Sequence, residues 1–207
     1  MTADVFIWTT GGRRISLVNP TVEDVAPELI AGPLSRLCRW TGHVGCDLYS
    51  VAQHCVVVSH LLTPEHALAG LLHDAAEPFT GDLNSPMKAI MRSVRFCGKC
   101  GSDRQPCGSA FDVIGANFDA LISERYRVDL SHPDIHIADA VAAIFEARIL
   151  VGVPDEELAA FFGDLMPVAE LLAMTLPASV GSMLAPLAPR DAERCWLQRL
   201  DELGGTR

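Results

Sequence analysis

One stretch of the sequence limits what this chain can fold into: residues 69–82, which read AGLLHDAAEPFTGD. An apolar run leads directly into His73 and Asp74, and Glu77 follows His73 by one helical turn. Pro78 cannot continue a helix, so we expect Glu77 at the helix end, followed by a turn. An imidazole and three carboxylates would then crowd one helix end, which is costly to bury unless a cation compensates. The alternative is an ordinary surface turn, so the interpretation depends on partners elsewhere in the chain.

The composition indicates a folded chain rather than a disordered, secreted or membrane-spanning one. The 207 residues suit one domain with a sizeable core, and 49% of them are hydrophobic. No apolar run reaches the roughly 18 residues that a membrane-spanning helix needs, and the N-terminus lacks the pattern of a signal peptide. Seven scattered cysteines favour a reducing compartment. We therefore expect a cytoplasmic protein with no membrane partner.

The formal charge of −10 argues against a nucleic-acid partner, because binding to nucleic acid needs a basic surface. A small anionic substrate stays compatible with this charge, since a bound metal and a few basic residues can reverse the sign of the local potential. We therefore expect a small-molecule partner and no nucleic acid.

Helical patterns dominate the chain and predict an all-α fold. Two short β-rich pieces flank Gly11 and Gly12, which predicts a β-hairpin or an extended N-terminal arm. We expect helices over residues 25–37, 50–62, 66–77, 87–94, 110–125, 133–147, 155–162, 165–174 and 190–203. With no internal repeat or boundary visible, residues 1–207 are assigned to one domain, with its core over 21–151 and a helical C-terminal extension over 152–207.

An insertion over residues 97–108 interrupts the helical pattern and contains Cys97, Cys100 and Cys107. The Cys-x-x-Cys pair and the third cysteine resemble a zinc knuckle, but this run offers no clear fourth ligand. A redox pair would lack the βαβ surroundings that such pairs have. An irregular loop with free thiols and a small structural metal site both stay open.

Two further ionisable residues, His54 and Asp139, lie inside apolar helical segments. A lone histidine there is more often a satisfied core residue than a ligand, whereas an unpaired carboxylate is costly. Small residues one turn after Asp139 leave room for another group to approach. Glu146 shares the helix face of Asp139 and is either the partner of a ligand or an exposed acid.

Two imidazoles and two carboxylates, from His54, His73, Asp74 and Asp139, suit a divalent transition metal. Their spacings of nineteen and sixty-five residues differ from zinc-finger spacings and fit ligands that converge within a helical bundle. We therefore predict one divalent metal ion as cofactor, with Mn, Co, Fe, Zn or Mg as candidates.

Arranged as H…HD…D, these four residues resemble the metal signature of the HD-domain phosphohydrolase superfamily, over residues 39–148. The Arg-Trp pair at 39–40, the run HDAAEPFTGD and the run PMK at 86–88 are similar to the bacterial 5′-deoxynucleotidases. The runs NPTVED and YSVAQH are similar to the small phage-encoded deoxynucleoside triphosphate hydrolases of the same superfamily. The resemblance implies an HD-domain helical bundle that acts on deoxynucleotides.

The resemblance also implies a role for each matching residue. It makes the four residues of the signature the ligands of a single metal. Glu77 matches the acid that acts on the attacking water, and Asp82 matches the acid near the leaving oxygen. Arg39 and Lys88 match phosphate contacts, while Trp40 matches the residue that packs near the sugar, where its bulk disfavours a 2′-hydroxyl. The Cys97–Cys107 insertion and the Pro-rich C-terminal third fall outside the family pattern.

We therefore expect a metal-dependent phosphohydrolase that removes the 5′-phosphate or the triphosphate from deoxynucleotides, and that forms a homo-oligomer, a dimer or larger. The enzymatic alternative is a nucleotide pyrophosphohydrolase or cyclic-nucleotide phosphodiesterase on the same scaffold. The non-enzymatic alternative is a metal-stabilised module that binds a nucleotide or a partner without catalysis.

Overall fold

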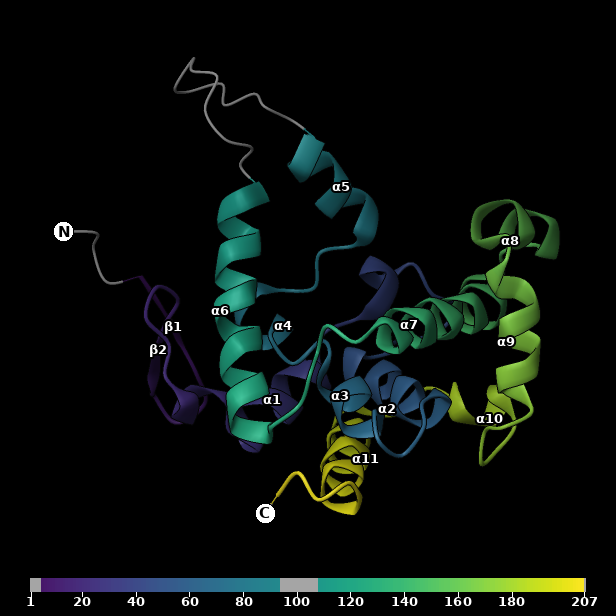
Figure 1. The fold of residues 1–207 in the computed structure, drawn as a ribbon. Coiled ribbons are helices and arrows are strands. Elements are labelled where there is room, and N and C mark those ends of the chain that lie inside the picture. The colour runs from purple at the N-terminus through teal and green to yellow at the C-terminus, as the bar shows by residue number, and fades with distance from the viewer. Residues whose placement is uncertain (1–4, 94–107, 207) are drawn as a thin grey trace.

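The computed structural model describes residues 5–93 and 108–206, and these are mostly helical, as predicted. The hairpin expected near the N-terminus is present: β1 (Phe6–Trp8) pairs antiparallel with β2 (Arg14–Ser16). Gly11 and Gly12 connect the strands with positive φ angles, a conformation in which glycine is favoured. The hairpin lies beside α6 at one edge of the molecule (Figure 1).

The helices that follow the hairpin are mostly short and succeed one another closely along the chain. They are η1 (Val22–Val25), α1 (Pro27–Leu34), η2 (Arg39–Gly42), α2 (Val51–Leu61), α3 (Ala67–Leu72), α4 (Glu77–Thr80), α5 (Ser85–Ser93), α6 (Gly108–Tyr126), α7 (Pro133–Glu146), η3 (Ala147–Val151), α8 (Asp155–Phe162), α9 (Leu165–Ala173), α10 (Val180–Met183) and α11 (Pro189–Glu202). In the described parts of the chain, none of them combines the length and apolarity needed to cross a membrane.

Helix α2 lies at the centre of the packing, against α3, α7 and α11. Ser50 caps its first turn by accepting a hydrogen bond from the backbone N–H of Gln53, at 3.3 Å, as the sequence predicts. Cys55 of α2 belongs to one hydrophobic cluster, and Val57 and Val58 belong to another. Because both sides of the helix are buried, any polar side chain along it needs a partner inside the protein.

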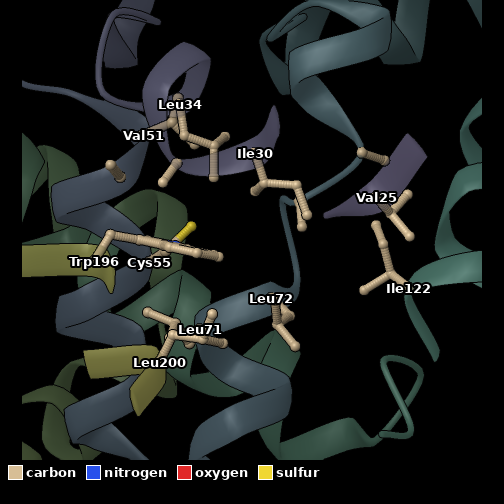
Figure 2. Close-up of a cluster of buried hydrophobic side chains, with 14 of the residues drawn as sticks. Val25, Ile30, Leu34, Val51, Cys55, Leu71, Leu72, Ile122, Trp196 and Leu200 are labelled. Atoms are coloured by element: carbon tan, nitrogen blue, oxygen red, sulfur yellow. The ribbon is translucent and has the colours of Figure 1, made fainter. Parts of the chain in front are cut away.

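The first hydrophobic cluster joins helices that are far apart in the sequence. Figure 2 shows Trp196 and Leu200 of α11 beside Cys55 of α2 and Leu71 of α3, with residues of α1 and α6 further across. The second cluster packs α7 against α2, α8, α9 and the segment around α10. The part of the chain predicted as a C-terminal extension therefore contributes to both clusters.

The structure differs from the prediction after the His73–Asp74 pair. Helix α3 ends at Leu72, and Glu77 is the first residue of α4 rather than the last residue of the helix before it. Pro78 lies in the first turn of α4, where its missing N–H needs no partner, so it begins a helix instead of ending one. The His73–Asp74 pair accordingly lies in a turn between two short helices.

Smaller differences concern helix boundaries. Helix α5 begins two residues before the predicted start at residue 87, and Asn84 caps it by accepting a hydrogen bond from the backbone N–H of Met87 at 2.9 Å. The short helix α10 was not predicted. Cys97, Cys100 and Cys107, the proposed structural metal site or free thiols, lie outside the described residues.

Replacing Leu71 by alanine should reduce the free energy of unfolding by about 2–5 kcal/mol, because Leu71 is fully buried in the first cluster. The matched control is Leu171→Ala on α9, where the leucine is 65% exposed and the change should cost less than about 0.5 kcal/mol. Urea denaturation followed by circular dichroism measures both. Equal losses in the two variants would contradict the packing of Leu71 in the first cluster.

Candidate metal centre

The four residues of the H…HD…D set lie together in the structure. Nε2 of His54 on α2 lies 3.3 Å from Nε2 of His73, 3.0 Å from Oδ1 of Asp139 on α7, and 3.8 Å from Oδ2 of Asp74. Nε2 of His73 lies 3.2 Å from Oδ2 of Asp74 and 3.9 Å from Oδ1 of Asp139. Helices α2 and α7 and the turn after α3 therefore bring these side chains together. The ligand atoms of His54, His73 and Asp74 all lie within 4.8 Å of one another, and Asp139 approaches this group of three through the two histidines.

These separations fit ligands of one shared cation. With metal–ligand distances of ~2.1 Å, neighbouring donors lie ~3.0 Å apart in an octahedron and ~3.4 Å apart in a tetrahedron. The same distances place two imidazole rings on one ion roughly 4.6–5.3 Å apart, and the ring centroids of His54 and His73 are 5.2 Å apart. The donor set is therefore suited to a divalent metal in both chemistry and spacing.

Each imidazole is held by its other ring nitrogen. Nδ1 of His54 lies 2.6 Å from Oε1 of Glu146, and Nδ1 of His73 lies 2.8 Å from the backbone oxygen of Gly70. These contacts make Nδ1 the donor in each ring, so Nε2 is the atom that would bind a metal once it loses its proton. Such contacts fix the tautomer and orientation of metal-binding histidines.

Glu146 is the partner of a ligand and not an exposed acid, which decides between the two roles that the sequence left open. Its side chain is fully buried, and Oε2 accepts hydrogen bonds from Nε1 of Trp40 at 3.0 Å and from Nε of Arg39 at 3.2 Å. Burial opposes ionisation of Glu146, but Arg39 and His54 outweigh it and hold its pKa below the usual value. One carboxylate thus orients His54, Arg39 and Trp40 together.

The short helix η2 adopts an unusual backbone conformation beside this carboxylate. Trp40 and Thr41 have φ angles of 57° and 53°, in the left-handed region that non-glycine residues rarely occupy. Such residues cost of order 1–3 kcal/mol each and persist only where the surroundings hold them. The indole of Trp40 is anchored on Glu146, and the backbone N–H of Arg39 donates to the oxygen of Tyr49 at 2.9 Å.

Charges at the cluster stabilise one another in the metal-free protein. Burial lowers the pKa of His73, but its ion pair with Asp74 outweighs burial and raises that pKa well above the usual value. Burial works against Asp74 as well, and His73 nevertheless holds its pKa below the usual range. Asp139 is held at a pKa of about 2, because His54 outweighs the effect of burial. Protons on the imidazoles therefore compensate the carboxylates where a cation would otherwise do so.

Asp139 departs from the prediction in one respect. Its side chain is 42% exposed, so it is less buried than its place inside an apolar helical segment suggests. Nη2 of Arg39 lies 4.0 Å from Oδ1 of Asp139, so the arginine lies beside this carboxylate.

Glu77 lies next to the four-residue cluster and is nearly fully buried. Its Oε1 is 3.7 Å from Nζ of Lys88, and among the described residues its Oε2 has no hydrogen-bond partner. Burial first, and then the charges of Asp74 and Asp82, raise the pKa of Glu77 to about 9. A buried oxygen without a partner indicates a place for water, an ion or a substrate group.

A pocket of about 290 Å³ opens beside Glu77. It is bounded by the end of α3 and by α4, α5 and α6, and its lining includes His73, Glu77, Lys88, Phe111 and Asp119. Lys88, which matches a phosphate contact in the resemblance, lines this pocket and pairs with Glu77. Asp82 is partly buried, and burial raises its pKa.

Asp119 is a site residue that the sequence analysis missed. It lines the pocket from α6, and burial together with the charge of Asp74 raises its pKa to about 6. Its signal in the sequence is weak: it directly follows Phe118, which is fully buried, so it lies at the edge of a buried helix face. Only the packing of α6 against α4 brings it to the pocket.

Comparisons with known proteins add relatives without a described activity. No family model matches the chain. It is 29% identical over 204 residues to the uncharacterized protein YfdR of Escherichia coli (strain K12), covering 98% of this chain and 97% of YfdR. It is 31% identical over 170 residues to the uncharacterized protein RCAP_rcc00048 of Rhodobacter capsulatus, covering 76% of this chain and 79% of that protein.

Replacing Glu146 by alanine should reduce the free energy of unfolding by about 3–5 kcal/mol, because Arg39 and His54 would lose their buried counter-charge. The control Glu170→Ala changes an exposed acid on α9 and should alter that free energy by less than about 0.5 kcal/mol. Urea denaturation of both variants is the measurement. A loss below about 1 kcal/mol in the Glu146 variant would contradict the role of this carboxylate.

Stability of the metal-free protein should fall as the pH rises from 6.5 to 9. His73 has a folded-state pKa above its ordinary value of 6.5, so its stabilising charge is complete below pH 6.5 and is lost as the pH rises through the folded value. Glu77 acts in the same direction, since it stays protonated in the folded state up to about pH 9 but ionises near 4.5 when unfolded. Urea denaturation with a chelator present measures the slope. Glu77→Gln should make the slope shallower, and a stability that increases over this range would refute the assignment.

Proposed function

We propose that this protein is a divalent-metal-dependent phosphohydrolase that acts on deoxynucleotides. The chain belongs to the same protein family as the Rhodobacter capsulatus relative. Because the name of that relative assigns no activity, the proposal rests on the site. The observation that carries the proposal is the convergence of His54, His73, Asp74 and Asp139 beside the buried carboxyl of Glu77. An HD-type helical bundle is part of the same proposal, since the four residues follow one another along the chain as H…HD…D.

The residues around the cluster are suited to hydrolysis of a phosphate ester. A divalent ion held by the four ligands would supply a Lewis acid for the phosphoryl oxygens and for water. With a divalent cation bound nearby to lower its pKa from about 9, Glu77 can accept the proton of an attacking water, because its carboxyl borders the pocket and one of its oxygens is uncommitted. Asp82, whose pKa burial raises, can return a proton to the leaving oxygen.

Two cations border this region and can hold the phosphate. Arg39 uses Nε for Glu146, so its terminal nitrogens stay available for a bidentate contact with phosphate oxygens. Lys88 reaches the pocket from α5 as a point charge and lies opposite Glu77. Both are needed because developing negative charge must be offset during phosphoryl transfer.

Trp40 is proposed to pack near the sugar and to disfavour a 2′-hydroxyl by its bulk. Its indole is fixed by the hydrogen bond to Glu146, so the ring cannot turn aside easily. The pocket of about 290 Å³ next to the cluster is large enough for part of a nucleotide. The homo-oligomer and the cytoplasmic location remain predictions from the sequence.

The test is phosphate release from a panel of deoxynucleoside mono- and triphosphates in the presence of Mn²⁺, Co²⁺ or Zn²⁺. We expect a deoxynucleoside with phosphate or triphosphate as products. Pyrophosphate with a monophosphate would identify a pyrophosphohydrolase, and an opened cyclic ring would identify a phosphodiesterase. Protein that holds metal but releases no product from any substrate would end the proposal.

Glu77→Gln should lower turnover by about 10²–10⁴-fold while metal binding is retained, because it removes proton transfer but keeps the size of the side chain. Glu124→Gln, at an exposed position on α6, is the matched control and should leave turnover unchanged. Steady-state kinetics and a metal-binding isotherm are measured on the same preparations. If Glu77→Gln kept full turnover, the non-catalytic alternative would be favoured.

A further inference from the structure

A second group of potential metal ligands lies away from the four-residue cluster. His66 at the start of α3, and His132 and Asp134 at the start of α7, offer ligand atoms that all lie within 4.8 Å of one another. The two segments are far apart in the sequence and meet where α3 packs against α7 (Figure 1). Two imidazoles and a carboxylate form a donor set for a borderline divalent cation, which a purely acidic surface group does not.

We propose that His66, His132 and Asp134 form a second divalent metal site, which takes zinc or a similar transition metal and connects α3 to α7. This inference does not depend on the proposed enzymatic activity. The site has room for ligand exchange, since the side chains of His132 and Asp134 are partly exposed to solvent. Water can therefore complete the coordination sphere.

The imidazole rings of His66 and His132 are already in contact, but they must move apart to bind one ion together. Their ring centroids lie 3.8 Å apart with an angle of 23° between the planes, which is a stacked arrangement. Two imidazoles on one ion lie roughly 4.6–5.3 Å apart, so the rings would separate by about 1 Å on binding. Nδ1 of His132 accepts a long hydrogen bond of 3.3 Å from the backbone N–H of Asp134, so the neutral ring carries its proton on Nε2. A metal would bind Nδ1 in exchange for this weak hydrogen bond, or Nε2 after the proton moves to Nδ1.

The charge around this group favours a cation even though two helices begin there. Helix N-termini carry partial positive charge, which opposes metal binding. Asp134 lies with its Oδ2 3.8 Å from Nδ1 of His132, and Asp129 is close enough for both imidazoles to lower its pKa, after the larger effect of its hydrogen bonds from Ser131. Two carboxylates therefore offset the helix ends.

The position of the second group couples it to the first. His66 precedes His73 by seven residues, and His132 precedes Asp139 by seven residues. The two segments that carry the second site therefore also carry, two helical turns later in the sequence, the proposed ligands His73 and Asp139 of the first site. A cation at the second site would fix the relative placement of α3 and α7, on which the geometry of the first cluster depends.

The experiment is a titration of the full-length chain with Co²⁺ or Zn²⁺ by isothermal calorimetry. Cys97, Cys100 and Cys107 are replaced by serine in every arm, so that thiolates do not contribute. Asp74→Asn weakens the first site, and the remaining binding is expected to belong to the second. Adding His132→Ala to that background should weaken the remaining binding by at least about tenfold. His136→Ala, an exposed histidine one turn further along α7, is the matched control and should change nothing.

A second readout does not depend on stoichiometry. Zinc should raise the melting temperature of the Asp74→Asn protein, because a ligand that binds only the folded state stabilises it. That increase should disappear with His132→Ala or His66→Ala and persist with His136→Ala. The proposal is overturned if the Asp74→Asn protein binds no metal, or if all three histidine variants bind it equally. Either result leaves the proposed function intact, since that function requires only the first cluster.

Discussion

The carboxylate of Glu146 lies in the interior between α7 and α2, where it meets the imidazole of His54, the indole of Trp40 and the guanidinium of Arg39. A buried carboxylate is tolerated only where donors or opposite charges surround it. The three donors come from η2 and α2, so the ionised state of Glu146 and the position of both elements depend on each other. The left-handed conformation of Trp40 and Thr41 is held in place by the same contacts. The four-residue cluster is assembled around this interaction, since His54 reaches its place through it.

Charge balance extends from Glu146 through the rest of the site. Arg39 lies between Glu146 and Asp139, and both imidazoles lie beside carboxylates. In the absence of metal, protons on His54 and His73 provide the compensation, and the pKa of each is raised. A divalent ion would replace these protons, because metal ligands must be deprotonated. Metal and proton are therefore alternative ways of satisfying the same group of carboxylates.

Much of the architecture follows from local signals in the sequence. The caps and prolines around α2, α7, α8 and α11 place these helices within one or two residues, because caps and Pro residues act over a single turn. The four potential ligands could be identified because burying an ionisable side chain inside an apolar segment costs free energy in any fold, unless a partner or an ion compensates it. The break between α3 and α4 could not be predicted from the sequence, because a proline one turn after an apolar run is equally compatible with a helix end and a helix start.

The sequence left two roles open for Glu146 and did not indicate Asp119, for a related reason. Whether an acid on an amphipathic helix faces water or a partner is decided by helices that pack against it from elsewhere in the chain. Glu146 is buried by η2 and α2, and Asp119 reaches the pocket because α6 lies against α4. Asp139 is 42% exposed although Ala138 and Ala142 beside it are buried, because the apolar pattern of α7 does not show which residues lie at the edge of its buried face.

Helix α11 supplies Ala192, Trp196 and Leu200 to a cluster whose other fully or nearly fully buried members come from the first two-thirds of the chain. During synthesis these partners leave the ribosome well before α11 does, and until then the apolar surfaces of α1, α2 and α3 have no cover on that side. The nascent protein therefore passes through a stage in which its central helix is exposed to chaperones and to other chains. The first cluster is complete only when α11 has packed against these helices.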